Sequence, residues 1–302
     1  MKEYMGLAWW NTGISPNRKK SRASDDEWII ASEVFTRLAA ANHLIGLGEI
    51  SSADLLELKK LVNPEILGLF EFSGASSKSG RSYFDTCIAY RKDLVSVIKS
   101  DDLQLFVGNR VYRIAQYFEL VLTTGSQSLH VLISHWPSRI NMPPSDPVRT
   151  QLGASLREKI KDLHVIDGKA QVVLLGDYND EPFAESISEA LLATRDRDLA
   201  RKKSNLVYNP FWRHLSAYVH ESVETSPYDK GTYYFRKGHL TKWHTFDQMM
   251  FSKALLVGEG DWKLNESDTR IMVDVDFYNV VTVKRTIFDH FPIVSRFERA
   301  ES

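Results

Sequence analysis

The segment with the clearest chemical character follows a short apolar run, Val172–Leu175, and reads Gly-Asp-Tyr-Asn from Gly176 to Asn179. Side chains two apart in a strand share a face, so Asp177 and Asn179 are expected to point the same way. A carboxylate can hold or deprotonate a water molecule and an amide can donate to a phosphate oxygen, so the pair suits phosphoryl chemistry. Gly-Asp-x-Asn is also an ordinary turn sequence, and the segment alone leaves both interpretations open.

Four further apolar segments also end in polar residues. Strand ends on one rim of a sheet are places where a rigid scaffold can present catalytic groups. Asp247 is the hardest of these residues to explain as purely structural, because a carboxylate inside an apolar strand needs a partner. The segments are Trp10-Asn11, Gly48-Glu49, Ser134–Arg139, and the pair Phe246–Gln248 with Phe288–Pro292.

Taken in order, these segments read WN, GE, SHWPSR, GDYND, FDQMMFS and FDHFP. The chain resembles the endonuclease/exonuclease/phosphatase superfamily on these motifs, from Asn11 to His290. That superfamily includes pancreatic-type deoxyribonuclease, abasic-site endonucleases, neutral sphingomyelinases and inositol-polyphosphate 5-phosphatases. The resemblance implies an α/β (α+β) fold, a four-layer sandwich of two mixed β-sheets flanked by helices, as a single catalytic domain over residues 1–302.

The resemblance also implies a divalent metal site. Glu49 would be the main ligand, with Asn11 beside it and Asp289 helping on the same side. All three are oxygen donors, and such a set suits Mg²⁺ or Mn²⁺, whereas a soft or histidine-rich set would suggest zinc. Taken singly, Glu49 could merely precede a helix, and Asp289 could be a helix cap or part of a turn.

Catalytic roles are implied for five residues. Asp177 would orient or deprotonate the attacking water, and Asn179 would bind a phosphate oxygen. His290 would contact the scissile phosphate while Asp247 holds it, and a carboxylate there would raise the pKa of the imidazole. His135 would meet the phosphate or the leaving oxygen, although a lone histidine is more often structural.

Arg139 is a candidate substrate-binding residue, because a guanidinium matches phosphate with two parallel hydrogen bonds. An ordinary surface arginine is the alternative. The aromatic segment 208–234 could stack on bases or lipid, or belong to the core. Two basic patches, residues 18–22 and 195–203, are the local candidates for polyanion contact.

Composition sets further limits. The chain has 302 residues, of which 43% are hydrophobic, and a net charge of −1, so no global field draws it to nucleic acid. Cys87 is the only cysteine, which excludes an intrachain disulfide and a four-cysteine zinc site. The N-terminus lacks a long apolar stretch, and no run approaches the roughly 20 apolar residues that cross a bilayer. We expect a cytoplasmic protein with no stable membrane association.

Hydrophobic periodicity predicts helices and strands mixed along the chain, which favours two packed sheets over one doubly wound sheet. No internal repeat or linker interrupts this pattern. Expected helices cover residues 25–39, 53–61, 148–163 and 185–199. Expected strands cover residues 5–10, 43–49, 66–70, 84–91, 103–107, 116–123, 129–134, 170–177, 231–236, 245–251, 273–283 and 292–297.

The sequence therefore predicts a Mg²⁺-dependent phosphodiesterase, most simply a nuclease with DNA or RNA as substrate. The alternative enzyme is a phosphatase or phospholipase-C-like hydrolase acting on inositol phosphates or phospholipids. A non-catalytic binding module is the third hypothesis, although the chain keeps Glu49, Asp177 and His290. No motif indicates a protein partner.

Overall fold

The computed structural model describes residues 3–15, 23–74, 78–79, 82–216 and 230–300. Among these residues, no helix is both long enough and apolar enough to span a bilayer. The helices are α1 (Asp25–Ala41), α2 (Ser52–Leu61), α3 (Pro64–Leu67), α4 (Pro147–Ile166), α5 (Arg197–Lys202), α6 (Lys253–Val257) and α7 (Val275–Thr282), with a π-helical turn over Ser186–Ala190 and a 3₁₀ turn over Pro210–His214.

Two mixed sheets form the centre of the molecule. The first has the strand order β16 (Trp262–Ile271), β17 (Ile293–Arg299), β1 (Tyr4–Asn11), β2 (Leu44–Gly48), β6 (Cys87–Arg91) and β3 (Phe70–Gly74). The second has the order β11 (Ala193–Thr194), β12 (Val207–Tyr208), β15 (Asp247–Ser252), β10 (Gln171–Asp177), β9 (Ser128–His135), β8 (Arg110–Leu122) and β7 (Val95–Val107). Two short ribbons pair β4 (Lys78–Ser79) with β5 (Ser82–Tyr83) and β13 (Tyr233–Tyr234) with β14 (Trp243–His244).

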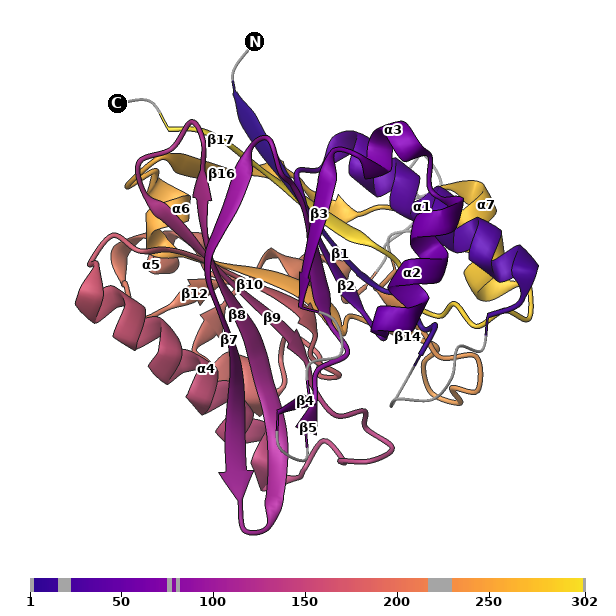
Figure 1. Cartoon of the computed structure of the whole chain (residues 1–302). Coiled ribbons are helices and arrows are strands. Elements are labelled where there is room, and N and C mark those ends of the chain that lie inside the picture. The colour runs from indigo at the N-terminus through magenta and orange to yellow at the C-terminus, as the bar shows by residue number, and fades with distance from the viewer. Residues whose placement is uncertain (1–2, 16–22, 75–77, 80–81, 217–229, 301–302) are drawn as a thin grey trace, which may run out of the picture.

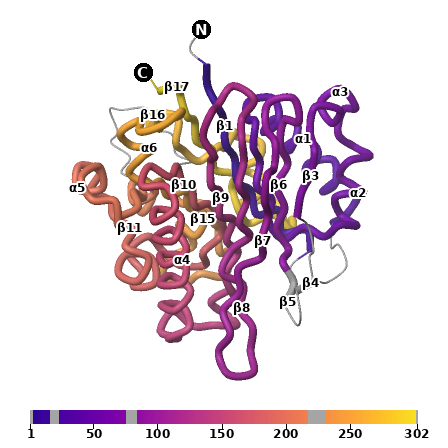
Figure 2. Tube along the Cα trace, turned by 60° about the vertical axis from the view of Figure 1, so that its left-hand side comes forward, coloured from indigo at the N-terminus to yellow at the C-terminus, as the bar shows by residue number. Residues whose placement is uncertain are grey.

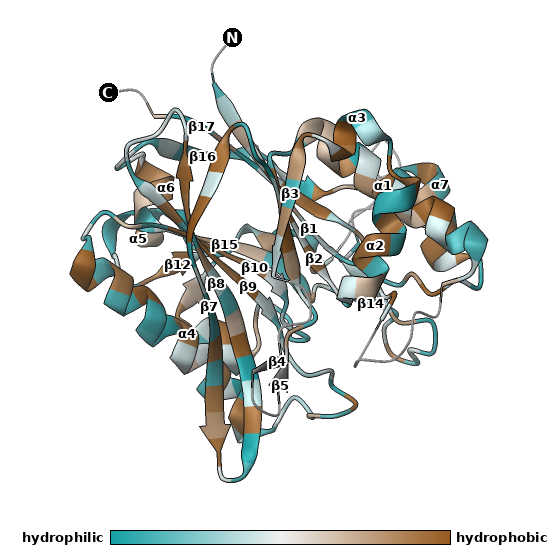
Figure 3. Ribbon diagram, in the orientation of Figure 1, coloured by the Kyte–Doolittle hydropathy of each residue, from teal (hydrophilic) through white to brown (hydrophobic). Residues whose placement is uncertain are grey.

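The sheets face each other, and helices cover their outer sides (Figures 1 and 2). Helices α1, α2, α3 and α7 lie on one side and α4 lies on the other. In Figure 3 the central strands β1, β2, β9 and β10 carry mostly apolar residues, whereas the surrounding helices mix apolar and polar ones. The expected sandwich of two mixed sheets flanked by helices is confirmed.

Strand β10 has four consecutive apolar residues, Val172–Leu175, because both of its faces are buried. Val173 and Leu175 belong to the core that includes the space between the sheets, whereas Val172 and Leu174 belong to the core under α4. A strand buried on both faces has no polar side, so it reads as a continuous apolar run. Polar residues lie at its two ends, Gln171 and Asp177, and Asp177 is the one at the rim.

Helices α1 and α2 begin where the sequence provides capping boxes. Ser24 caps α1 and bonds reciprocally with Glu27, and Ser51 does the same with Asp54 at the start of α2. Glu27 also accepts a hydrogen bond of 2.8 Å from the backbone N–H of Ile287. The cap of α1 thereby anchors the segment that leads to His290.

Two predicted elements have the wrong type. Residues 273–283 form helix α7 instead of a strand: Asp274 caps it, and its buried side chains follow the helical spacing of Phe277, Val280 and Val281. The β-branched residues favour a strand, but the cap at Asp274 and the 3.6-residue period of the buried side chains favour the helix that forms. Residues 66–70 are likewise not a strand, because Pro64 starts the short helix α3 and β3 begins only at Phe70.

Other predicted boundaries also differ. The helix expected over residues 185–199 is broken by Leu192, whose φ of 63° cannot continue a helix, and a short strand and α5 follow. The strand expected over residues 231–236 shrinks to Tyr233–Tyr234. Strand β16 was not expected, because it is only partly buried and its register shifts between Asn265 and Arg270, which breaks the apolar alternation.

Substitution of Gly176 tests how closely strands β9 and β10 approach each other at the rim. Its φ is 148°, and a Cβ there would lie 1.9 Å from the carbonyl oxygen of Ser134. Gly176→Ala is expected to lower the free energy of unfolding by more than about 2 kcal/mol, measured by urea denaturation. Gly168→Ala is the control, because a Cβ there meets no atom within 4 Å. Equal stability of the Gly176→Ala protein would contradict this close approach.

Candidate active site

Strand register brings the predicted residues to one rim of the sandwich. In the second sheet, Asp177 lies directly opposite His135 of β9 and Asp247 of β15. In the first sheet, Asn11 lies opposite Gly48, the last residue of β2. Polar side chains from several parts of the chain therefore meet where these strands end.

Two hydrogen bonds join the sheets at this rim. The Asn11 amide donates from Nδ2 to Oδ2 of Asp177 over 3.0 Å. The indole Nε1 of Trp9 donates to Oδ1 of Asp247 over 2.7 Å. All four side chains are buried, so each bond satisfies a polar group that water does not reach. The sequence did not single out Trp9, because tryptophan in an apolar strand gives no sign of a buried acceptor.

His290 is fixed by two carboxylates. Its Nδ1 lies 2.7 Å from Oδ2 of Asp247, and its Nε2 lies 3.7 Å from Oδ2 of Asp177. Burial alone would lower the pKa of His290, but Asp247 and Asp177 outweigh it and raise the pKa to about 10. The contact expected between Asp247 and His290 is therefore present, and it favours a charged imidazole.

His135 is fixed in the same manner. Its Nδ1 lies 2.9 Å from Oδ1 of Asp85, while its Nε2 lies 3.7 Å from Oε1 of Glu49 and 3.9 Å from Oδ2 of Asp177. Burial would lower the pKa of His135, but Asp85 raises it above the ordinary value. Asp85 also bonds to Arg113.

Sequence reasoning missed Asp85 and Arg113. Burial would raise the pKa of Asp85, yet Arg113 and His135 outweigh it and hold that pKa well below the ordinary range. The available signal was a carboxylate inside the strand predicted over residues 84–91, which needs a buried partner as Asp247 does. That partner could not be named from sequence, because β8 supplies Arg113 from 28 residues away.

Glu49 follows β2 in a left-handed conformation with a φ of 49°. Its side chain is 18% exposed, and burial raises its pKa to about 7, to which Asp289 adds by repulsion. Asp289 is 41% exposed, with Oδ1 3.8 Å from Nε2 of His290. Oδ1 of Asn11 accepts from the N–H of Gly13 over 3.1 Å, so this predicted ligand already has one donor.

These residues fit a divalent cation. The carboxylates of Glu49 and Asp289 repel each other, and the raised pKa of Glu49 marks a charge that a nearby cation would stabilise. A second group, Asp177, Asp247 and His290, offers ligand atoms within 4.8 Å of one another. In that group Asp247 and His290 already form a hydrogen bond with each other. This favours a hydrogen-bonded pair that shares a proton over a set of metal ligands.

Asn179 reaches the site by a route that the sequence analysis did not anticipate. Strand β10 ends at Asp177, and Asn179 has a φ of 50°, so strand alternation does not place it. Its N–H donates to Oδ1 of Asp177 over 2.8 Å, and its Nδ2 donates to the carbonyl of Trp136 over 3.0 Å. One of its two amide hydrogens is therefore committed to the protein.

Arg139 braces the loop after β10. Its Nε donates to the carbonyl of Asn179 over 3.0 Å, its Nη2 lies 3.6 Å from Asp180, and its guanidinium lies over the ring of Phe246. The buried Arg149 holds the other oxygen of Asp180 at 3.3 Å. Arg139 thus lies beside the predicted site, with part of its hydrogen-bonding capacity used by the protein.

Three rings form what we call the aromatic wall: Tyr233, His244 and Phe246. The ring of Tyr233 stacks on Phe246 with centroids 5.3 Å apart and lies 4.6 Å from the ring of His290. His244 stacks on Phe246 at 4.7 Å, and its Nδ1 lies 2.8 Å from Oε1 of Glu181. The wall therefore adjoins His290.

The aromatic segment and the two basic patches that the sequence suggested lie in different environments. In the aromatic segment 208–234, Tyr208 and Phe211 lie in the core, whereas Tyr233 lies in the aromatic wall. In the basic patch 195–203, Arg195 lies over the Trp212 ring and Arg197 pairs with Glu266 at 2.9 Å. The basic patch 18–22 lies outside the described residues.

Titration of His290 tests this network. In metal-free buffer, the imidazole is expected to stay protonated well above pH 7, because its pKa is raised to about 10. This folded pKa exceeds the unfolded value of 6.5, so the pair stabilises the fold fully below pH 6.5, and the contribution is lost as pH rises through about 10. NMR of the ring resonances measures both states.

Asp247→Asn is expected to move the His290 pKa down toward its ordinary value, since burial remains and the main partner is gone. The control is Asp289→Asn, whose carboxylate contributes less, so the shift should be smaller. Deprotonation of wild-type His290 near pH 6.5 would contradict the assigned network.

Comparison with known proteins identifies the family of the chain. A sequence model described as the Endonuclease/Exonuclease/phosphatase family matches residues 26–279. No curated protein matches the chain. Among solved structures, the human Nocturnin catalytic domain with a bound sulfate anion has a TM-score of 0.60 at 15% identity and covers 99% of this chain and 96% of that one.

Two other solved structures are similarly close. D. rerio TDP2 complexed with a single-strand DNA product has a TM-score of 0.61 at 16% identity, covering 98% of this chain and 99% of that one. A family protein from Bacteroides thetaiotaomicron has a TM-score of 0.60 at 14% identity, covering 99% and 98%. At these identities the likeness shows a shared fold. Because the family match spans most of its length, the chain belongs to the endonuclease/exonuclease/phosphatase family, which includes metal-dependent nucleases and phosphatases.

Proposed function

We propose that the chain is a Mg²⁺-dependent phosphodiesterase that hydrolyses DNA or RNA. The observation that carries this proposal is the arrangement of two histidines around Asp177. The Nε2 atoms of His135 and His290 lie 3.9 and 3.7 Å from Oδ2 of Asp177, and each ring is fixed through Nδ1 by its own carboxylate, Asp85 or Asp247. Two imidazoles that converge on one carboxylate suit a phosphate and an attacking water.

Glu49, Asp289 and Asn11 would hold the Mg²⁺ ion, or Mn²⁺ in its place. When bound, the ion supplies positive charge that neutralises phosphate oxygens. Asn11 would bind the ion through Oδ1, the oxygen that accepts a hydrogen bond from the N–H of Gly13. The oxygen-only set matches the preference of these ions.

The protein side chains supply the remaining chemistry. Asp177 orients or deprotonates the attacking water, and its Oδ1 is already steadied by the N–H of Asn179. His290 donates a hydrogen bond to the scissile phosphate, and the second amide hydrogen of Asn179 donates to another phosphate oxygen. His135 meets the phosphate or the leaving oxygen, and Arg139 contributes to substrate binding.

The aromatic wall supports a nucleic acid substrate over a phospholipid. Tyr233 is partly exposed, and its ring lies 4.6 Å from the ring of His290. Aromatic faces stack on bases with little regard to sequence, at about 1–3 kcal/mol per base. TDP2, one structural relative, was solved with a single-strand DNA product. A phosphatase or phospholipase-C-like hydrolase remains the alternative enzyme, and a non-catalytic module the second alternative.

We also propose that residues 1–302 act as one catalytic domain, because the site draws on residues from Asn11 to His290. A cytoplasmic location is proposed from the single cysteine: Cys87 is buried and free, and burial raises its pKa to about 12, as suits an unreactive structural thiol.

A substrate panel tests the reaction. Plasmid, single-stranded DNA, RNA, inositol phosphates and phosphoinositide vesicles are incubated with Mg²⁺ or with chelator. Nucleic acid cleavage is expected only with Mg²⁺, and Asp177→Ala should lower the rate by at least about 10³-fold because the group that activates water is lost. The exposed Asp198→Ala is the control, with an unchanged rate.

The other outcomes of the panel separate the alternatives. Phosphate release from inositol substrates alone would favour the phosphatase or phospholipase-C-like hydrolase. Absence of turnover of any phosphoester by the folded wild-type protein would favour the binding module.

Glu49→Gln tests the metal assignment. The change keeps the side-chain size and removes the charge, so the Mg²⁺ concentration for half-maximal activity is expected to rise at least about tenfold. Direct Mn²⁺ binding, measured by calorimetry without substrate, should weaken in parallel. Glu57→Gln on the exposed face of α2 is the matched control. Unchanged Mn²⁺ binding in the Glu49→Gln protein would reject Glu49 as a ligand.

A further inference from the structure

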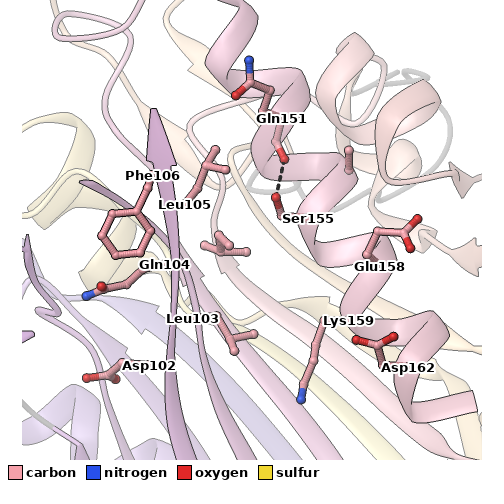
Figure 4. Close-up of a pocket in the computed structure, with 12 residues that line it drawn as sticks. Asp102, Leu103, Gln104, Leu105, Phe106, Gln151, Ser155, Glu158, Lys159 and Asp162 are labelled. Atoms are coloured by element: carbon pink, nitrogen blue, oxygen red, sulfur yellow. Dashed lines mark hydrogen bonds between the residues drawn. The ribbon is translucent and has the colours of Figure 1, made fainter. Parts of the chain in front are cut away.

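Arg149 is the one charged residue of helix α4 that is buried, with 1% of its side chain exposed. On the side of the helix toward β7, Gln151, Glu158 and Asp162 instead line a groove (Figure 4). An arginine is almost never fully buried unless it is paired, because removing its charge from water costs several kcal/mol. Arg149 therefore needs partners inside the protein.

Most of these partners lie in the loop after β9, residues 136–146. The Nη2 atom of Arg149 donates to the carbonyl of Pro137 over 2.8 Å and to that of Met142 over 2.6 Å. Its Nε donates to the carbonyls of Met142 and Pro143 over 3.1 and 3.2 Å. One guanidinium thus fixes the loop between β9 and α4 at three carbonyls.

The remaining partner is Asp180, in the loop after β10. Its Oδ2 lies 3.3 Å from Nη1 of Arg149, and the same oxygen accepts from the hydroxyl of Ser186 over 2.6 Å. Asp180 is 1% exposed. Burial raises the pKa of its carboxyl, and the charge of Arg149 opposes this rise more than any other group does. The two residues form a buried ion pair that joins the loops after β9 and β10.

This ion pair supports Asn179 from two sides. Asn179 precedes Asp180, and its φ of 50° is a conformation that a residue other than glycine keeps only where its surroundings hold it. Its Nδ2 donates to the carbonyl of Trp136, the residue before Pro137, whose own carbonyl accepts from Arg149. Both the backbone of Asn179 and the acceptor of its amide are therefore attached to the same buried pair.

We propose that Arg149 and Asp180 are positioning residues for Asn179. The pair holds the two loops in one arrangement, so that the second amide hydrogen of Asn179 stays aimed at the phosphate oxygen. This role rests on the proposed function, in which that hydrogen meets the phosphate. A misplacement of about 1 Å can cost roughly 10²-fold in rate, so two residues that do not touch the substrate control the reaction through the side chain that does.

Amide hydrogen exchange, measured by NMR without substrate, tests the positioning directly. Arg149→Lys keeps the charge, but one ammonium cannot replace a guanidinium that serves three carbonyls and a carboxylate. The N–H of Asn179, which donates to Asp177, is expected to exchange at least about tenfold faster. Arg157→Lys, the same substitution at a position of α4 that is 38% exposed, is the matched control and should exchange as wild type does.

A kinetic cycle with Asn179→Gly provides the second arm, because glycine accepts the φ of 50° and lacks the amide. On the nucleic acid that the wild type cleaves, Arg149→Lys should lower kcat at least about tenfold and change KM by less than about threefold. In the Asn179→Gly background the same change should cost less than about twofold, since the group that it positions is gone. Asp180→Asn, which keeps the side-chain shape, should give the same pattern.

The outcomes separate this proposal from the proposed function. Faster exchange at Asn179 in a chain that cleaves no phosphoester would uphold the positioning and reject the proposed function. Unchanged exchange at Asn179, or equal losses of kcat in both backgrounds, would overturn the positioning. Acceleration of the Val173 and Leu174 amides in the centre of β10 by the same factor would also overturn it, because that result identifies a general loss of stability.

Discussion

The structure depends on buried carboxylates whose oxygens need hydrogen-bond donors from other parts of the chain. Asp85, Asp177 and Asp247 are almost inaccessible to water, and removing an ion from water costs several kcal/mol even after the protein relaxes. Each is therefore surrounded by donors that come from other strands. The donors to Asp247 and Asp177 include Trp9 and Asn11 of the opposite sheet, so the hydrogen bonds that satisfy these carboxylates also align the two sheets.

This alignment sets the chemistry of the rim. Because His135 and His290 each give Nδ1 to a carboxylate, both rings are oriented and both Nε2 atoms face the same oxygen of Asp177. Near Glu49 there are more carboxylates than fixed hydrogen-bonding partners for them, and burial raises the pKa of Glu49. An arrangement with oriented donors on one side and surplus negative charge on the other suits an anionic phosphate that arrives with a cation.

Local patterns determined much of this molecule. The apolar runs that end in Asn11, Glu49, His135 and Asp177 indicated strands whose ends carry polar groups, because each such signal lies within a few neighbouring residues. The order of these motifs along the chain indicated the family. Tertiary structure decided what spacing cannot encode: the left-handed turn that aims Asn179, the partnership of Asp85 with Arg113 and His135, and helix α7 where β-branched residues suggested a strand. These features depend on contacts between residues far apart in the chain, and the free energy of burying a charge is known only once its neighbours are in place.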